Sequence, residues 1–171
     1  MEIREFQTKL FARGQEAGFA DMEVYYQADR DLSVKVFKGE IDSYTIEERG
    51  GLSFRGVFGG KMGYSFTEKL DADSIDLLLK EARENAEIME SEDREELFGG
   101  SERYAEFNSS EQVANISPDA LIEAARTMER VALEADPRVD LVNYCMVVKS
   151  VNQLSILHWP GSRISASSTA W

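Results

Sequence analysis

Residues 32–67, LSVKVFKGEIDSYTIEERGGLSFRGVFGGKMGYSFT, decide the fold of this chain. Apolar and polar residues alternate along four short runs, which is the pattern of half-buried β-strands. Lys38-Gly39-Glu40, Arg49-Gly50-Gly51 and Gly59-Gly60-Lys61 separate the runs, and short glycine-containing turns join neighbouring strands into antiparallel hairpins. The stretch therefore predicts a β-meander, with strands at about 32–38, 41–48, 52–58 and 61–67.

Helical periodicity flanks the meander on both sides. Apolar residues at helical spacing predict a helix at 2–17 that ends before Gly18, followed by a strand at 22–28. A second helix begins at Asp71 or Asp73, because either carboxylate can accept hydrogen bonds from free N–H groups in a first turn. Its buried stripe is expected to comprise Ile75, Leu78, Leu79, Ala82, Ala86 and Met89.

A third helix is marked by Ser117, Pro118 and Asp119, which suit the N-cap, the first position and the first turn. Its end is predicted at Asp136-Pro137. The expected apolar face consists of Leu121, Ala125, Met128, Ala132 and Ala135. Two strands are then expected at about 139–149 and 153–158, joined through Ser150-Val151-Asn152.

The predicted order is α-β-β-β-β-β-α, a connection, then α-β-β, which is an α+β fold with an antiparallel sheet and flanking helices. We expect an N-terminal α/β domain at 1–90, a linker or long connection at 91–116, and a helix with a β-hairpin at 117–158 that starts the next portion. Residues 159–171 form an atypical tail without periodicity. We interpret this tail as out of frame, because the Trp159 and Pro160 codons read one nucleotide later give a glycine codon.

Composition limits the class of protein. The net charge of −13 argues against nucleic-acid binding, since phosphates would be repelled and no basic stripe compensates. The apolar runs are too short to span a bilayer, and the acidic N-terminus does not resemble a signal peptide. The single cysteine, Cys145, excludes an internal disulfide and fits a reducing compartment. We therefore expect a cytoplasmic protein that binds neither membranes nor nucleic acid.

The usual catalytic residue types are scarce. A zinc site needs three or four clustered ligands, and no spacing of His, Cys, Asp or Glu supplies them, so neither metal-binding nor catalytic residues are predicted. Cys145 and His158 could face each other across the predicted hairpin. A buried structural cysteine beside an exposed histidine is the favoured interpretation, because a reactive thiolate needs an electropositive setting.

Candidate partner or peptide contacts gather in the meander: they are Arg55, Gly56, Gly60, Lys61 and Tyr64. Arg55 interrupts an apolar run, and three interpretations stay open. It points outward without further role, it pairs with a carboxylate such as Glu47, or it contacts a partner.

The glycines of the same region, Gly56, Gly59, Gly60 and Gly63, allow a peptide to add to accessible sheet backbone as a further strand. Glycines that serve only sheet twist and turns are the favoured alternative.

Several segments together resemble the N-terminal domain of the TldD/PmbA family, in which PmbA is also called TldE. They are Lys38-Gly39-Glu40-Ile41, Gly51-Leu52-Ser53-Phe54-Arg55, Gly60-Lys61-Met62-Gly63-Tyr64 and the Glu81-Ala82-x-x-x-Ala86 helix. The resemblance extends over about residues 15–157, and Glu23-Val24-Tyr25 with Asn152-Gln153-Leu154-Ser155-Ile156 favours the PmbA branch. It implies a cytosolic zinc metalloprotease system for peptide maturation, whose members were once described as modulators of DNA gyrase.

In this family the TldD-type subunit carries a His-Glu-x-x-x-His zinc motif in its C-terminal half, and the PmbA-type subunit pairs with it and lacks the motif. This chain stops before that half, so the resemblance implies zinc in the catalytic partner or the missing half and not here. We expect a non-catalytic N-terminal fragment with a structural, subunit-contact or peptide-channel role. Its implied partners are a family-like subunit or a second copy, joined through the 139–158 hairpin, and a peptide substrate in the full assembly.

Two rival interpretations remain. A small acidic dimeric chaperone or adaptor would fit the length and composition, but it does not account for the glycine pattern of the meander. A stand-alone enzyme that uses Arg55 and neighbouring carboxylates is the least favoured, because nothing in the sequence places two carboxylates across a cleft.

Overall fold

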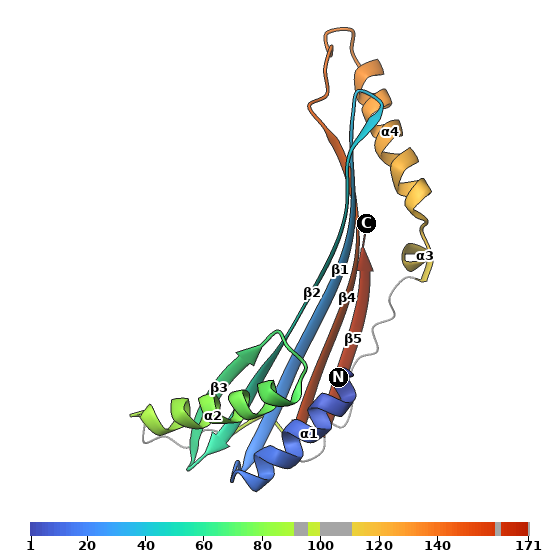
Figure 1. Cartoon of the computed structure of the whole chain (residues 1–171). Helices are drawn as coiled ribbons and strands as arrows, with labels where there is room; N and C mark the ends of the chain where they lie inside the picture. The colour runs from blue at the N-terminus through green and yellow to red at the C-terminus, as the bar shows by residue number, and fades with distance from the viewer. Residues whose placement is uncertain (91–95, 100–110, 160–161, 171) are drawn as a thin grey trace. The chain divides into compact units, whose positions relative to one another are not determined.

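The computed structural model describes residues 1–90, 96–99, 111–159 and 162–170 (Figure 1). In chain order the elements are α1 (Ile3–Glu16), β1 (Asp21–Phe37), β2 (Glu40–Phe58), β3 (Lys61–Thr67), α2 (Ala72–Ile88), α3 (Glu111–Ala114), α4 (Pro118–Glu134), β4 (Cys145–Trp159) and β5 (Ser162–Ala170). The strands lie side by side in the order β3-β2-β1-β4-β5. The predicted α+β class with an antiparallel sheet is confirmed.

The chain forms two compact units. Unit 1 contains Met1–Gln27, Gly50–Glu106 and Leu154–Ala166, and unit 2 contains Ala28–Arg49, Phe107–Gln153 and Ser167–Trp171. The strands β1, β2, β4 and β5 each contribute to both units. The domain boundaries expected from the sequence stay a prediction, as does the linker at 91–116, most of which lies outside the described residues.

The strands are fewer and longer than predicted. β1 joins the two runs expected at 22–28 and 32–38, and β2 continues through Gly50-Gly51, where a turn was predicted. Gly51 serves close packing instead, because a Cβ there would lie 2.9 Å from the ring of Phe66. β4 likewise runs through the turn predicted at 150–152, so a single strand at Cys145–Trp159 replaces the hairpin predicted at 139–158, and residues 139–144 precede it outside any strand. The segment interpreted as an atypical, out-of-frame tail contains the strand β5.

Two of the predicted turns are confirmed. Lys38 and Gly39 have φ values of 53° and 78° between β1 and β2, and Gly59 and Gly60 have φ values of 60° and 83° between β2 and β3. Two consecutive residues with positive φ give the turn whose twist matches antiparallel strands. The second turn sets the register that pairs Phe58 with Lys61.

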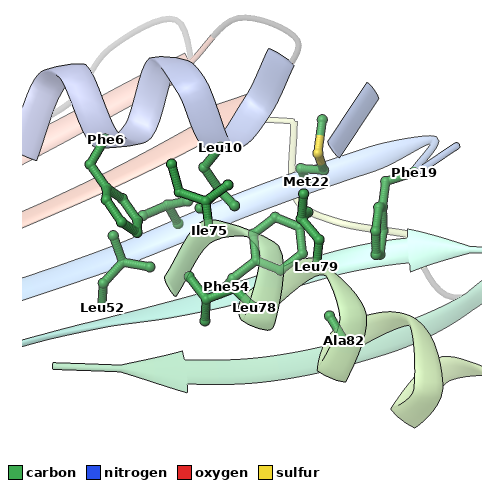
Figure 2. Close-up of a cluster of buried hydrophobic side chains, with 11 residues drawn as sticks. Phe6, Leu10, Phe19, Met22, Leu52, Phe54, Ile75, Leu78, Leu79 and Ala82 are labelled. Carbon is green, nitrogen blue, oxygen red and sulfur yellow. The ribbon is translucent and has the colours of Figure 1, made fainter. Parts of the chain in front are cut away.

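The core of unit 1 forms where α1 and α2 pack on one face of the sheet (Figure 2). Fully buried side chains include Phe6 and Leu10 from α1 and Leu52 and Phe54 from β2. Asp71 caps α2 as predicted, and the predicted stripe of α2 is buried apart from its last member. Met89 is 40% exposed, because α2 ends one residue before it.

The core of unit 2 lies under α4, where Leu121 and Ala125 pack against Val34, Val36 and Val147. The predicted cap is confirmed, since the Ser117 side chain accepts the N–H of Ala120 and Pro118 follows at the first position. The predicted apolar face of this helix is wrong beyond its second turn. Met128 is 49% exposed, and the buried position next to it belongs to Glu129.

Candidate functional site

The predicted contact residues fall on opposite sides of the unit 1 sheet. Arg55 and Tyr64 are partners in the β2–β3 register and both are exposed. Gly56 is buried on the side that faces the helices. Gly60 lies in the β2–β3 turn. The ammonium group of Lys61 donates a hydrogen bond to the carbonyl of Met89 at the end of α2. The structure thus brings together Arg55 and Tyr64 and separates them from the other three.

Of the interpretations left open for Arg55, pairing with a carboxylate is observed, and the partner is Glu23 on β1 rather than Glu47. Arg55 Nε lies 3.0 Å from Glu23 Oε1, and the Nη2 group donates to the same oxygen. The side chain of Glu23 is 13% exposed and that of Arg55 is 46% exposed. Because the pair is open to water on the arginine side, its net contribution to stability is about 1 kcal/mol or less.

Three exposed aromatic side chains share this side of the sheet. Tyr25 is 36% exposed, Tyr64 51% and Phe66 52%. Neighbouring positions on β3, Gly63 and Ser65, are buried on the helix side, which places Tyr64 and Phe66 opposite them. We call Glu23, Tyr25, Arg55, Tyr64 and Phe66 the outer face; its mixture of aromatic rings and an arginine is the composition of protein contact surfaces.

Gly56 of β2 and Gly63 of β3 serve close packing on the helix side of the sheet. A Cβ at Gly56 would lie 2.5 Å from the ring of Phe19, and a Cβ at Gly63 would lie 1.8 Å from the carbonyl oxygen of Ala82 in α2. The two glycines are partners in the β2–β3 register and both are buried. They allow Phe19 and α2 to pack directly on the sheet.

Glu129 is a conspicuous residue that the sequence analysis missed. Its carboxylate oxygens accept the backbone N–H groups of Lys38 and Gly39, each at 2.6 Å, and its residue exposure is only 4%. A buried carboxylate needs such donors, since burial without them is costly. The signal was present in the helix, where Glu129 continues the spacing of Leu121 and Ala125 on the buried side.

His158 is buried, at 9% exposure, which corrects the expectation of an exposed histidine. Its Nε2 lies 2.6 Å from Asp21 Oδ1, although the ring N–H direction does not meet hydrogen-bond geometry. The carboxylate of Asp21 also accepts the N–H groups of Met22, at 3.0 Å, and Leu97, at 3.3 Å. Asp21 therefore holds the start of β1, the end of β4 and residue 97 together within unit 1.

Cys145 is buried, as predicted. Burial raises the pKa of the Cys145 thiol above its ordinary value of 9.0, and the negative charge of Glu129 adds to the effect. Cys145 and His158 belong to the same strand, β4, and to different units, so they do not face each other across a hairpin. The arrangement favours an unreactive thiol and gives no support to Cys–His chemistry.

A metal-binding cluster would require several donor side chains close together. Within the described residues, no group of three or more His, Cys, Asp and Glu side chains could hold a metal ion. These side chains therefore do not fit the zinc site that the resemblance implies for the assembly, and we derive no metal-dependent step from them. None of the helices in the described part of the chain is long and apolar enough to cross a membrane.

An apolar groove lies between α4 and β4 in unit 2, with a volume of about 670 Å³. Its lining includes Ala124 and Met128 from α4 and Met146 and Val148 from β4. Met128 and Met146 are 49% and 48% exposed. Methionine side chains adapt to differently shaped apolar partners, and they are common at binding surfaces. We refer to this feature as the α4–β4 groove.

Comparison with known proteins agrees with this architecture. Residues 22–86 match the family model for the PmbA/TldA metallopeptidase domain 1. The comparison with curated proteins gives no match.

Solved structures with the same fold include a protein described as a modulator of DNA gyrase from Thermotoga maritima, with a TM-score of 0.83 and 21% identity over 98% of this chain. TldE from Thermococcus kodakarensis has a TM-score of 0.79 and 17% identity over 96% of this chain. A second protein described as a modulator of DNA gyrase, from Bacteroides thetaiotaomicron, has a TM-score of 0.79 and 17% identity over 97%.

This chain spans 38%, 37% and 38% of these three proteins, respectively. Residues 22–86, which include the meander, its Lys38-Gly39 turn and the Gly63 contact with α2, are thus similar to domain 1 of the PmbA/TldA metallopeptidases.

Proposed function

We propose that this chain is the N-terminal part of a PmbA/TldD-type subunit, closer to the PmbA branch, in a cytoplasmic zinc metallopeptidase system for peptide maturation. The match of residues 22–86 to domain 1 carries the proposal, and the shared fold over nearly the whole chain supports it. The zinc and the catalytic groups belong to another part of the assembly. The role of this chain is structural: it forms a subunit contact and borders the path of the peptide.

The α4–β4 groove is the surface we assign to the subunit contact. The segment expected to mediate dimerisation, 139–158, contains exposed apolar side chains at Val139, Leu141, Tyr144 and Met146. Apolar surface of this kind gains free energy when a partner covers it, and its neighbours on α4 extend the same patch. The partner is a second copy of this chain or a related subunit.

Light scattering coupled to size-exclusion chromatography tests the subunit contact. We expect the chain to self-associate. We expect the double variant Met128→Glu/Met146→Glu to lower the association constant at least tenfold, because each substitution places a charge in the groove. Met89→Glu is the matched control, since Met89 is also exposed but lies in unit 1. A monomer at every concentration, without and with a co-expressed TldD-type subunit, would overturn the assignment.

A further inference from the structure

A second cavity in unit 2 lies beside α3, with a volume of about 270 Å³. Its floor comes from the sheet, through Leu32 on β1, Ile46 on β2 and Val151 on β4, and Ile116 forms part of the opposite wall. Arg30 and Lys149 also line it. The cavity is apolar on three strands and carries two cationic groups, which is the composition of a small ligand site.

The cavity exists because the core of unit 2 stops short of it. Leu121 and Ala125 of α4 fill the space over Val34 and Val36. Further along the sheet the covering segment contributes Ala114, Ile116 and Pro118 to the lining of the cavity. The cavity opens to solvent, since Tyr44 and Ile46 in its lining are 45% and 51% exposed.

Lys149 supplies a positive charge that the described carboxylates do not neutralise. Its ammonium group donates to the carbonyl oxygens of Ala114, at 2.6 Å, and Ile116, at 2.9 Å. An ammonium group has three N–H donors, so one remains for a ligand. None of the ion pairs between described residues involves Lys149.

Arg30 contributes little net charge, because its Nε lies 3.2 Å from Glu48 Oε1. Within the part of the chain that the structure describes, the site therefore presents Lys149 as a cation without an ion-pair partner, in a chain whose net charge is −13. The hydroxyl group of Tyr44, which also lines the cavity, is a further donor for an anion.

We propose that this cavity binds a carboxylate attached to a short aliphatic side chain, the chemistry shared by an N-acylated leucine and by the C-terminal residue of a peptide. The carboxylate pairs with Lys149, and the aliphatic group rests on Leu32, Ile46 and Val151. The volume admits about one residue, since pockets for larger ligands start near 300 Å³. The inference is independent of the proposed subunit role, because it rests on this cavity alone.

Nuclear magnetic resonance titration of the whole chain with N-acetyl-leucine and its neutral amide tests the proposal. We expect shifts of the Leu32, Ile46 and Val151 signals with the acid, and at least tenfold weaker binding of the amide. A tetrapeptide ending in leucine that binds more tightly than N-acetyl-leucine identifies a peptide end as the ligand, and equal binding identifies a free acyl amino acid. No shift at millimolar acid, or equal affinity for acid and amide, overturns the proposal.

Two variants separate charge from shape. Lys149→Met keeps the apolar stem of the side chain and removes the charge, so binding of the acid should fall at least tenfold. Because this change also removes the contacts with α3, Ile46→Phe serves as the second variant: Ile46 is 51% exposed, and a larger ring there fills the cavity. Lys35→Met is the control, since Lys35 pairs with Asp42 and does not line the cavity. Unchanged binding in both test variants contradicts the assignment.

Discussion

At the scale of single residues, Glu129 links two elements that are far apart in the chain. Its carboxylate accepts hydrogen bonds from the backbone N–H groups of Lys38 and Gly39, which lie 91 and 90 residues earlier in the chain. The turn residues Lys38 and Gly39 have positive φ. This conformation is sterically unfavourable for Lys38, because its Cβ crowds the backbone, whereas glycine has no Cβ. The buried carboxylate offsets that penalty through two charge-assisted hydrogen bonds.

Glu129→Gln should lower the free energy of unfolding by about 1–3 kcal/mol, because the neutral amide keeps one acceptor and turns an N–H group toward the other donor. Urea denaturation followed by circular dichroism measures the change. Glu134→Gln, on the same helix but in an exposed ion pair with Arg130, is the control and should change it by less than about 0.5 kcal/mol. Equal effects in the two variants would mean that the contact with the turn is not stabilising.

The thiol of Cys145 should react with iodoacetamide far more slowly in the folded chain than in the chain unfolded by urea. Burial raises its pKa above the ordinary value of 9.0, so little thiolate forms at pH 7.5, and the group is shielded from the reagent. Mass spectrometry of time points gives both rates. Comparable rates in the folded and unfolded states would contradict the described burial.

At the scale of elements, the turns and caps were local enough to predict. Lys38-Gly39 and Gly59-Gly60 are turns, and Asp71 and Ser117 cap their helices, because each of these roles depends on neighbours within a few residues. Gly50-Gly51 looked the same in the sequence but lies within β2. A glycine needed for positive φ and one needed for close packing have the same local signature, and only the position of Phe66 distinguishes them.

The packing of α2 on β3 predicts that Gly63→Ala is strongly destabilising, by about 3 kcal/mol or more, or prevents folding. The added Cβ would lie 1.8 Å from the backbone oxygen of Ala82, which cannot move without displacing the helix. Gly99→Ala is the control, because nothing lies within 4 Å of the Cβ position there. The melting temperature and the soluble fraction after expression are measured for both variants. A Gly63→Ala chain as stable as the unchanged chain would show that α2 lies further from the sheet than described.

The start of α2 predicts a dependence of stability on pH. Hydrogen bonding by Ser74, through its side chain first and its backbone N–H second, lowers the pKa of Asp71 below its ordinary 3.8. A carboxylate with a depressed pKa stabilises the folded state above the unfolded pKa of about 4, and this stability is lost as the pH falls through the lower folded pKa. Asp71→Asn keeps a capping oxygen but does not titrate, so the difference in melting temperature between the two chains should shrink from pH 6 to pH 3. A difference in melting temperature that stays constant from pH 6 to pH 3 would show that titration of Asp71 does not contribute to the pH dependence of stability.

At the scale of the whole molecule, the negative net charge and the apolar α4–β4 groove have opposite effects on self-association. The chain has a net charge of −13, and the α4–β4 groove exposes Met128 and Met146. Two copies of such a chain repel each other over distances of about 10 Å at moderate salt, while the groove favours contact.

Self-association should therefore strengthen as the salt concentration rises. Sedimentation velocity at 50 mM and 500 mM NaCl measures it, and we expect a higher dimer fraction at 500 mM because salt screens the repulsion and leaves the apolar contact intact. A dimer fraction that falls with salt would indicate that ion pairs, and not the groove, hold the copies together.

What the sequence by itself determined is local: the alternation that makes strands, the Lys38-Gly39 and Gly59-Gly60 turns, the helix caps, the cysteine burial, and the resemblance of the meander to PmbA/TldD-type domain 1. Only the tertiary structure decided the partners of charged groups. Arg55 pairs with Glu23, His158 lies against Asp21, and Glu129 bonds the Lys38-Gly39 turn. The physical reason is distance along the chain: a strand, turn or cap depends on adjacent residues, whereas a buried charge is satisfied by whichever donor the packed sheet and helices bring to it.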